Sequence, residues 1–318
     1  MNSSKYINKL IIDGSESKVS DIHFKPSRSD VEVYNRIEGK ISYLETISHI
    51  DYRQALRYIK YMCKLDLGLC QTPQDGAYTV KVNDEEIFVR ISTIPLIYSE
   101  SLVIRILSDN NQLDTFANSY QPSDLQHIYE QIINNTGLFV FTGPTGSGKS
   151  SSMYALLSRA VDQKQKKVIC IEDPIEVIND RFTQIQINEK AGLTYSSCLK
   201  ACLRHDPDII MIGEIRDEET AKNVFRASLT GHTVISTMHT KNKYGVIERF
   251  LDFDFKQSEI NSVLIGISNQ RLIIDLEMKV KAYYDYVVGN QLEDLITSGE
   301  LVTIQDKLQI LELYATKQ

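Results

Sequence analysis

The sequence predicts an α/β protein in which an N-terminal α+β domain precedes a phosphate-loop domain built on a parallel sheet. A glycine-rich loop joins an apolar, strand-like run to a helical pattern in LFVFTGPTGSGKSSS, residues 138–152. Strand-like and helical segments alternate after this loop, which is typical of a parallel sheet with helices on both faces. Before it, short strands surround one helix. At 318 residues the chain is long enough for two such domains.

The N-terminal domain is expected over residues 1–107. The segments VEVYNRI and EIFVRIS alternate their side chains as strands do. Four apolar residues mark one face of a helix between them: Leu56, Ile59, Met62 and Cys63. The polar, turn-rich segment 108–122 then predicts a linker between the domains.

The phosphate-loop domain is expected over residues 123–275. The segment Ser123-Asp124-Leu125-Gln126 offers a capping box for its first helix. After the loop, KKVICI, DIIMI and HTVIST are predicted as buried strands, and residues 218–229 as a helix. After these alternating strands and helices the sequence pattern becomes irregularly helical. Residues 276–318 are therefore expected to form a small helical C-terminal region.

Composition and charge restrict the class of function. The chain is 42% hydrophobic and 24% charged, as in globular proteins, and its net charge of −7 argues against a general nucleic-acid binder, so direct DNA binding is not expected. No apolar run approaches the roughly 18 residues that a membrane span needs. We therefore expect a cytoplasmic protein that reaches a membrane through partners. The five cysteines form no C-x-x-C pair, so a zinc module is not expected. Cys198 and Cys202, one helical turn apart in a partly apolar segment, are expected to be buried structural thiols.

The glycine-rich loop matches the pattern G-x-x-x-x-G-K-[ST] without a mismatch. Its glycines let backbone N–H groups point at phosphate oxygens, and the helix after it presents its positive end to the anion. Lys149 is expected to reach the β- and γ-phosphates of ATP, and the Ser150 hydroxyl to ligate Mg²⁺. A glycine-rich turn without a ligand is the alternative. The residues expected to bind nucleotide are Gly143, Pro144, Thr145, Gly146, Ser147, Gly148, Lys149, Ser150 and Ser151.

Carboxylates and histidines follow the later strands, where ligands bind in parallel sheets. Glu214 comes after DIIMI and Gly213 and is the first candidate for the carboxylate that activates water; a solvated acid is the alternative. The cluster Glu172-Asp173-Pro174-Ile175-Glu176 is either a site that acts through Mg²⁺-bound water or a charged turn. His239 lies beyond a strand end and is expected near the γ-phosphate, whereas His232 is open to a structural or a functional role.

In these segments, the sequence resembles the secretion ATPases of the type II secretion and type IV pilus assembly family. Four segments in order carry the resemblance: GPTGSGKS, IEDPIE, LRHDPDIIMIGEIRDEETA and TGHTVISTMHT. Residues 20–26 (SDIHFKP), 73–76 (PQDG), 89–95 (VRISTIP) and 103–107 (VIRIL) extend it into the N-terminal half.

The resemblance implies a PAS-like N-terminal domain, a RecA-like ATPase domain and a homo-hexamer that acts on an inner-membrane platform protein. It implies that Glu172, Glu176 and His239 line the nucleotide site and that Glu214 is the catalytic glutamate. Two arginines of the N-terminal domain, Arg90 and Arg105, are implied to bring cationic charge to the phosphates. Surface ion pairs on a strand face are their alternative.

Two departures from the family pattern matter. Ala77 stands where the segment PQDG is often followed by arginine, which predicts the loss of an interdomain contact. The four-cysteine zinc module of many members is missing, which narrows the expected function. The compact chain looks most like the Gram-positive competence ATPase, which powers a pseudopilus for DNA uptake. The alternatives are a type II secretion or type IV pilus assembly ATPase, or a nucleotide-controlled scaffold with little hydrolysis.

Overall fold

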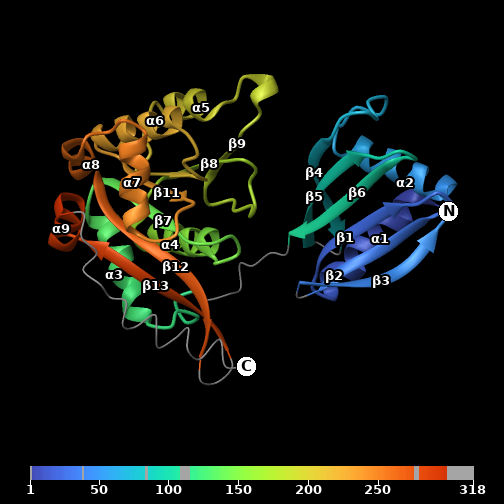
Figure 1. The fold of residues 1–318 in the computed structure, drawn as a ribbon, viewed down its shortest axis with the longest axis horizontal. Coiled ribbons are helices and arrows are strands. Elements are labelled where there is room, and N and C mark those ends of the chain that lie inside the picture. The colour runs from blue at the N-terminus through green and yellow to red at the C-terminus, as the bar shows by residue number, and fades with distance from the viewer. Residues whose placement is uncertain (1, 38, 83–84, 108–114, 276–278, 299–318) are drawn as a thin grey trace. The chain divides into compact units, whose positions relative to one another are not determined.

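The computed structural model describes residues 2–37, 39–82, 85–107, 115–275 and 279–298. The chain divides into two compact units, Met1–Asn110 and Asn111–Gln318 (Figure 1). The boundary falls inside the predicted linker. The end of that segment belongs to the second unit, because Phe116 packs against its core and the Tyr120 amide donates to the Ala282 carbonyl at 2.8 Å.

The first unit is a six-stranded antiparallel sheet with the strand order β3-β2-β1-β6-β5-β4. Both predicted strands and the predicted helix are present in it. Its strands are β1 (Val19–Pro26), β2 (Val31–Ile37), β3 (Lys40–Ile47), β4 (Gln74–Val82), β5 (Glu85–Pro95) and β6 (Glu100–Leu107). Its helices are α1 (Ser3–Glu16) and α2 (His49–Met62).

Helices α1 and α2 cover one face of this sheet. Because successive side chains of a strand point to opposite faces, Ile22 and Phe24 of β1 enter the core together with residues of both helices, such as Ile11 and Ile59. The residue between them on the other face is His23, and Asp21 shares that face. The face away from the helices is therefore polar.

The second unit is a seven-stranded sheet with the order β13-β12-β7-β11-β10-β8-β9. All its described strand pairs are parallel except β12 with β13. Its strands are β7 (Gly137–Thr142), β8 (Val168–Glu172), β9 (Thr183–Gln186), β10 (Ile209–Ile212), β11 (Thr233–Met238), β12 (Leu264–Ile274) and β13 (Val280–Val288). Its helices are α3 (Pro122–Asn134), α4 (Lys149–Lys164), α5 (Tyr195–Cys202), α6 (Glu218–Leu229), α7 (Tyr244–Asp252), α8 (Gln257–Val263) and α9 (Asn290–Ser298).

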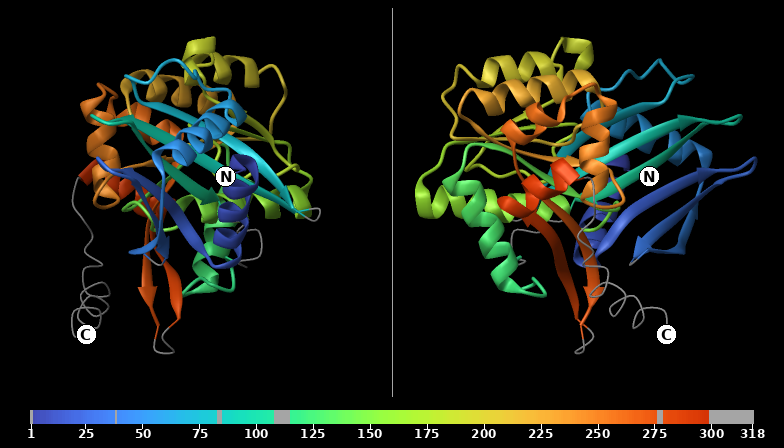
Figure 2. Two further views of the ribbon diagram at one scale, coloured as in Figure 1. Left: turned by 90° about the vertical axis from the view of Figure 1, so that its right-hand side faces the viewer. Right: turned by 60° about the vertical axis from the view of Figure 1, so that its left-hand side comes forward.

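The helical C-terminal region expected over residues 276–318 is wrong for Val280–Val288, which is strand β13. It pairs with β12 from Gly266 to Ile274, and the two form a long hairpin (Figure 2). The period of its side chains is two, since Ala282, Tyr284, Tyr286 and Val288 pack in one core cluster and Val287 packs in the cluster on the other face of the sheet. A helix does follow as α9, and residues 299–318 lie outside the described residues.

The predicted capping box of α3 is also wrong. The helix begins at Pro122, and its N-cap is Gln121, two residues before the predicted cap Ser123. Gln121 makes no side-chain capping bond. Proline suits the first helical position because its missing N–H has no intrahelical partner there. The helix start is thus fixed by the ring of Pro122.

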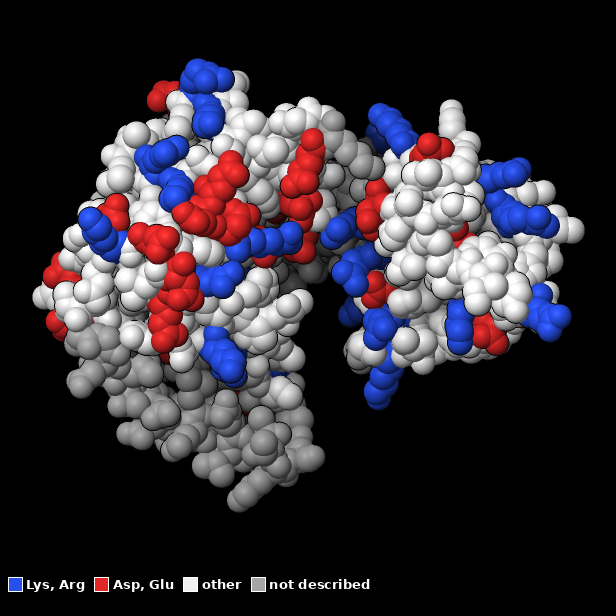
Figure 3. All heavy atoms as spheres, turned by 45° about the horizontal axis from the view of Figure 1, so that its top comes forward, with Lys and Arg blue, Asp and Glu red and all other residues white. Residues whose placement is uncertain are grey.

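Charged side chains of both signs are mixed on the surface. On the face that Figure 3 shows, Asp and Glu lie among the Lys and Arg of each unit. This mixture agrees with the net charge of −7. In the described parts of the chain, we find no helix with the length and apolar character of a membrane span.

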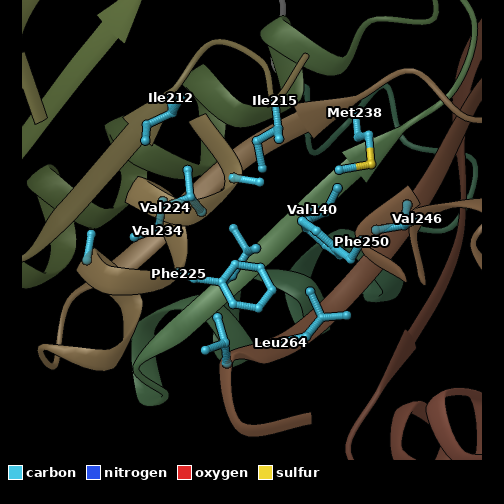
Figure 4. Packing of buried hydrophobic residues seen from close by; sticks show 14 of the residues in the cluster. Val140, Ile212, Ile215, Val224, Phe225, Val234, Met238, Val246, Phe250 and Leu264 are labelled. Carbon is cyan, nitrogen blue, oxygen red and sulfur yellow. The ribbon is translucent and has the colours of Figure 1, made fainter. Parts of the chain in front are cut away.

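Both faces of the second sheet are buried under helices. On one face, Val140 and Ile212 of the strands pack with Phe225 of α6 and Phe250 of α7 (Figure 4). On the other, Phe139 and its neighbours on the strands pack against α3 and α4. This explains why the strands read as continuous apolar runs, and it holds their carboxyl ends in fixed positions.

Four of the five cysteines are buried, and Cys70 is exposed. Cys198 and Cys202 lie in the core, and burial raises the pKa of the Cys202 thiol to about 11. A thiol with such a pKa is protonated and unreactive at neutral pH. Within the described residues, no group of His, Cys, Asp and Glu side chains is arranged to hold a metal ion.

Candidate nucleotide site

The phosphate loop lies between the carboxyl end of β7 and the first turn of α4. Three of its glycines have a positive φ that other residues rarely adopt, and a Cβ at Gly143 would also clash with backbone. A Cβ on Gly143 would stand 2.3 Å from the Gln270 carbonyl oxygen, and one on Gly148 would stand 3.0 Å from the Gln270 side-chain nitrogen. The glycines are therefore needed for the loop to close onto β12.

Lys149 folds back over this loop. Its ammonium donates to the carbonyl oxygens of Gly143 and Pro144, both at 2.9 Å, and the residue is buried. Burial lowers the pKa of Lys149, while Glu214 and Glu176 oppose that effect. The cation is thus held inside the loop, with two carboxylates near enough to influence it.

The first turn of α4 offers unpaired backbone donors. Its N-cap is Gly148, which makes no side-chain capping bond, so that the first N–H groups of a 16-residue helix have no capping partner. Such groups, with the helix dipole behind them, bind phosphate oxygens. Together with the loop glycines and Lys149, these donors fit the polyphosphate of a nucleotide.

Gln270 supports the loop from β12. The residue is buried, and its side-chain nitrogen donates to the Ser147 carbonyl at 2.8 Å. The Ser152 and Tyr284 hydroxyls, 2.7 Å apart, form a second link, between α4 and β13. The β12–β13 hairpin therefore holds both the loop and the helix that follows it.

Glu214 lies just past the end of β10, as predicted. Its side chain is 17% exposed, forms an ion pair with Arg216 and lies 3.5 Å from Nε2 of His239. The position is fixed by the neighbouring strand, because the Thr237 hydroxyl donates to the Gly213 carbonyl at 2.7 Å and the Ile215 amide donates to the Thr237 carbonyl at 2.9 Å.

The histidine segment is joined to the strand that carries the phosphate loop. The Thr142 and Thr240 hydroxyls are 2.6 Å apart at the ends of β7 and β11. His239 is next to this contact, and its side chain is half exposed. His232 is at the opposite end of β11, where its Nδ1 is 3.1 Å from the Thr230 hydroxyl, so the geometry supports a structural role for it.

Glu172 differs from the other carboxylates because its side chain turns inward. It ends β8, is buried, and accepts a hydrogen bond of 2.6 Å from the Tyr154 hydroxyl of α4. Gln184 of β9 in turn donates to Tyr154 at 2.8 Å. Burial raises the pKa of Glu172 to about 7, against the lowering effect of the Tyr154 bond. Glu176 stays exposed.

Arg90 and Arg105 are direct neighbours on β5 and β6 of the first unit. Together with Asp21, His23 and Arg36, they line a concave surface on the polar face of that sheet. The hollow that it encloses has a volume of about 590 Å³. Arg105 is 59% exposed, and its Nε donates to Asp21 at 2.8 Å. The two arginines are thus brought together within their own unit.

Several residues of this arrangement escaped the sequence reasoning. Tyr154 looks like an ordinary core position of a helix, and nothing in the sequence marks its bond to Glu172. Gln270 had a detectable signal, because the polar triplet Ser268-Asn269-Gln270 interrupts an apolar strand-like run. Asp21 lies in the segment SDIHFKP, but its partner Arg105 is 84 residues away.

A phosphate loop at the carboxyl end of a parallel sheet, with a carboxylate at a neighbouring strand end, defines a P-loop ATPase. The comparisons with known proteins narrow this class, since residues 2–311 match the family model of the type II/IV secretion system proteins. The chain belongs to that family.

Individual relatives agree with this assignment. The chain is 36% identical over 274 residues to the competence protein ComGA of Bacillus subtilis, a match that covers 86% of this chain and 77% of the relative. It is 35% identical over 270 residues to type II secretion system protein E of Klebsiella pneumoniae, of which it spans 54%. Among solved structures, the pilus retraction motor PilT with bound ADP is similar with a TM-score of 0.74 and 25% identity, over 96% of this chain and 89% of that one.

Proposed function

We propose that this ATPase is the motor that assembles a competence pseudopilus for DNA uptake. The observation that carries the proposal is the similarity to the competence protein ComGA, which extends over 77% of that protein and includes both units of this chain. The intact phosphate loop and Glu214 support a motor that hydrolyses ATP. Direct DNA binding is not part of the proposal, given the net charge of −7.

In this proposal, Glu214 orients and deprotonates the attacking water. Its carboxylate is close enough to influence Lys149, which marks the phosphate end of the site. Arg216 and His239 flank it and hold it in one orientation. Glu172 acts on the site indirectly, because its carboxyl group is engaged by Tyr154.

Mg²⁺ is the metal that this site would hold with ATP. The Ser150 hydroxyl, in the first turn of α4, is the protein ligand, in agreement with the pattern of phosphate loops. The ion would neutralise charge on the β- and γ-phosphates. Glu176 is exposed near the loop and is suited to contact water of the ion.

Arg90 and Arg105 are proposed to supply further cationic charge to the phosphates during hydrolysis. An arginine in that role can raise the rate by about 10³- to 10⁵-fold. The exposed guanidinium of Arg105 supports this assignment. As in the family that the sequence resembles, we propose a homo-hexamer at the cytoplasmic side of the membrane, bound to the platform protein of the machine.

A type II secretion or type IV pilus assembly ATPase is the second candidate, favoured by the 35% identity to the secretion protein of Klebsiella pneumoniae. A pull-down with the cytoplasmic part of each machine's platform protein shows which of these machines the ATPase binds. Binding to the secretion platform alone would reject the competence assignment.

Hydrolysis itself is tested by phosphate release from the purified hexamer. Glu214→Gln should retain ATP binding and lose most turnover, and Arg105→Ala should do the same. Equal rates for Glu214→Gln and the unaltered protein would reject the assignment of the base. Negligible release by the unaltered protein would favour a nucleotide-controlled scaffold.

A further inference from the structure

The polar face of the first unit carries a row of charged residues at its centre. Strand register places Arg36 of β2 opposite Asp21 of β1, Asp21 opposite Arg105 of β6, and Arg105 opposite Arg90 of β5. Residues opposite one another in a sheet point to the same face. One carboxylate therefore lies between arginines from the strands on either side of it.

Asp21 is buried although it carries a charge. Its side chain is 6% exposed, against 59% for Arg105. Both of its oxygens are engaged: Oδ1 accepts from Arg105 Nε at 2.8 Å, and Oδ2 accepts from the Ser20 hydroxyl at 2.8 Å and lies 3.7 Å from Arg36 Nε. Burial works against ionisation, but the bonds from Arg105 and Ser20 hold the pKa of Asp21 below its usual value.

The two flanking arginines are held differently. Arg36 also donates through Nη1 to the Gly39 carbonyl at 3.0 Å, which ties its guanidinium to the β2–β3 turn. Arg105 is held through Nε alone, and no bond within the described part of the chain engages its terminal nitrogens. Its two terminal amino groups are thus presented to the solvent in a fixed direction.

We infer that Asp21 is a positioning residue for hydrolysis, which aims the terminal nitrogens of Arg105 at an anion in the concave surface. The inference rests on the proposed role of Arg105. A carboxylate that accepted hydrogen bonds from the terminal nitrogens would compete with phosphate for them. A carboxylate that binds Nε leaves both terminal nitrogens able to donate to two phosphate oxygens. The anion is a phosphate group of the nucleotide.

The test compares phosphate release and nucleotide affinity for full-length variants. Asp21→Asn keeps the shape of the side chain and removes the charge that holds Arg105. We expect kcat to fall about 10- to 100-fold, the cost of a misplaced catalytic group, with little change in the dissociation constant for ATP. Glu32→Gln is the matched control, because Glu32 lies on the same strand as Arg36, contacts Tyr34 and pairs with no arginine among the described residues. Its kcat should stay unchanged.

A double variant separates positioning from a merely structural effect. In the background of Arg105→Ala, Asp21→Asn should cause no further loss of kcat, since its target is gone. An additional loss of the same size would overturn the inference, as would normal turnover of Asp21→Asn while Arg105→Ala is impaired. If Arg105→Ala itself turns over normally, the proposed role of Arg105 fails, and the inference fails with it. Thermal melts of each variant verify that the first unit remains folded.

Discussion

Substitution of Glu172 by glutamine should make the second unit more stable at alkaline pH. The pKa of Glu172 is about 7 in the folded protein, against an ordinary value of 4.5, chiefly because the carboxyl group is buried. The folded state therefore holds its proton more tightly than the unfolded chain does. The stability contributed by the protonated group is complete below pH 4.5 and is lost as the pH rises to 7.

The size of this effect follows from proton linkage. The difference between the two pKa values corresponds to about 3 kcal/mol of stability lost between pH 4.5 and pH 7. Glutamine cannot ionise, and its side-chain oxygen can still accept the hydrogen bond from Tyr154. Relative to the unaltered protein, Glu172→Gln should thus gain up to about 3 kcal/mol on going from pH 5 to pH 8.

The measurement is the unfolding midpoint at a fixed protein concentration and at pH 5 and pH 8. For a unit of this size, 3 kcal/mol corresponds to a change in Tm of about 6 to 12 °C. Glu189→Gln, an exposed substitution in the same unit, controls for the loss of one charge. Identical pH dependence in Glu172→Gln and the unaltered protein would refute the reasoning. Phosphate release by the same variant also separates an indirect role, which keeps turnover, from direct action on the nucleotide.

Two further substitutions test the phosphate loop. Lys149→Ala should abolish most binding of a fluorescent ATP analogue, because it removes the cation buried in the loop. Normal affinity in that variant would contradict the assignment of the phosphate loop as the nucleotide site. Gln270→Met keeps the volume of the side chain but removes its bond to the Ser147 carbonyl, so the affinity for ATP should fall about fivefold, the equivalent of one hydrogen bond. An unchanged affinity would mean that the loop keeps its shape without support from β12.

The parts of the structure that depend on local patterns could be predicted from the sequence. The phosphate loop is marked by glycines with positive φ values that other residues rarely adopt, and β7, β8, β10 and β11 are apolar runs because helices cover both faces of their sheet. Glu214 follows from its place at a strand end. These features need only the residues beside them.

The parts that depend on distant partners could not be predicted. Strand β13 lies at an edge of the sheet and mixes tyrosines with charged residues, so its sequence predicts irregular helix although its side chains have a period of two. The buried position of the Glu172 side chain depends on hydrogen bonds that involve Tyr154 and Gln184. The hydrogen bond between Asp21 and Arg105 depends on the register of their strands. No local pattern records such contacts.

In its proposed role, Lys149 exchanges hydrogen-bond partners when the nucleotide binds. Its ammonium donates to two carbonyl oxygens at 2.9 Å, and a phosphate that it binds would displace them. Hydrogen bonds to a charged group are worth about 1.5–3 kcal/mol each, so their return favours the departure of the product. An ATPase that works in cycles must release ADP in every cycle. The carbonyl oxygens of the loop assist that release, because they compete with the phosphates for Lys149.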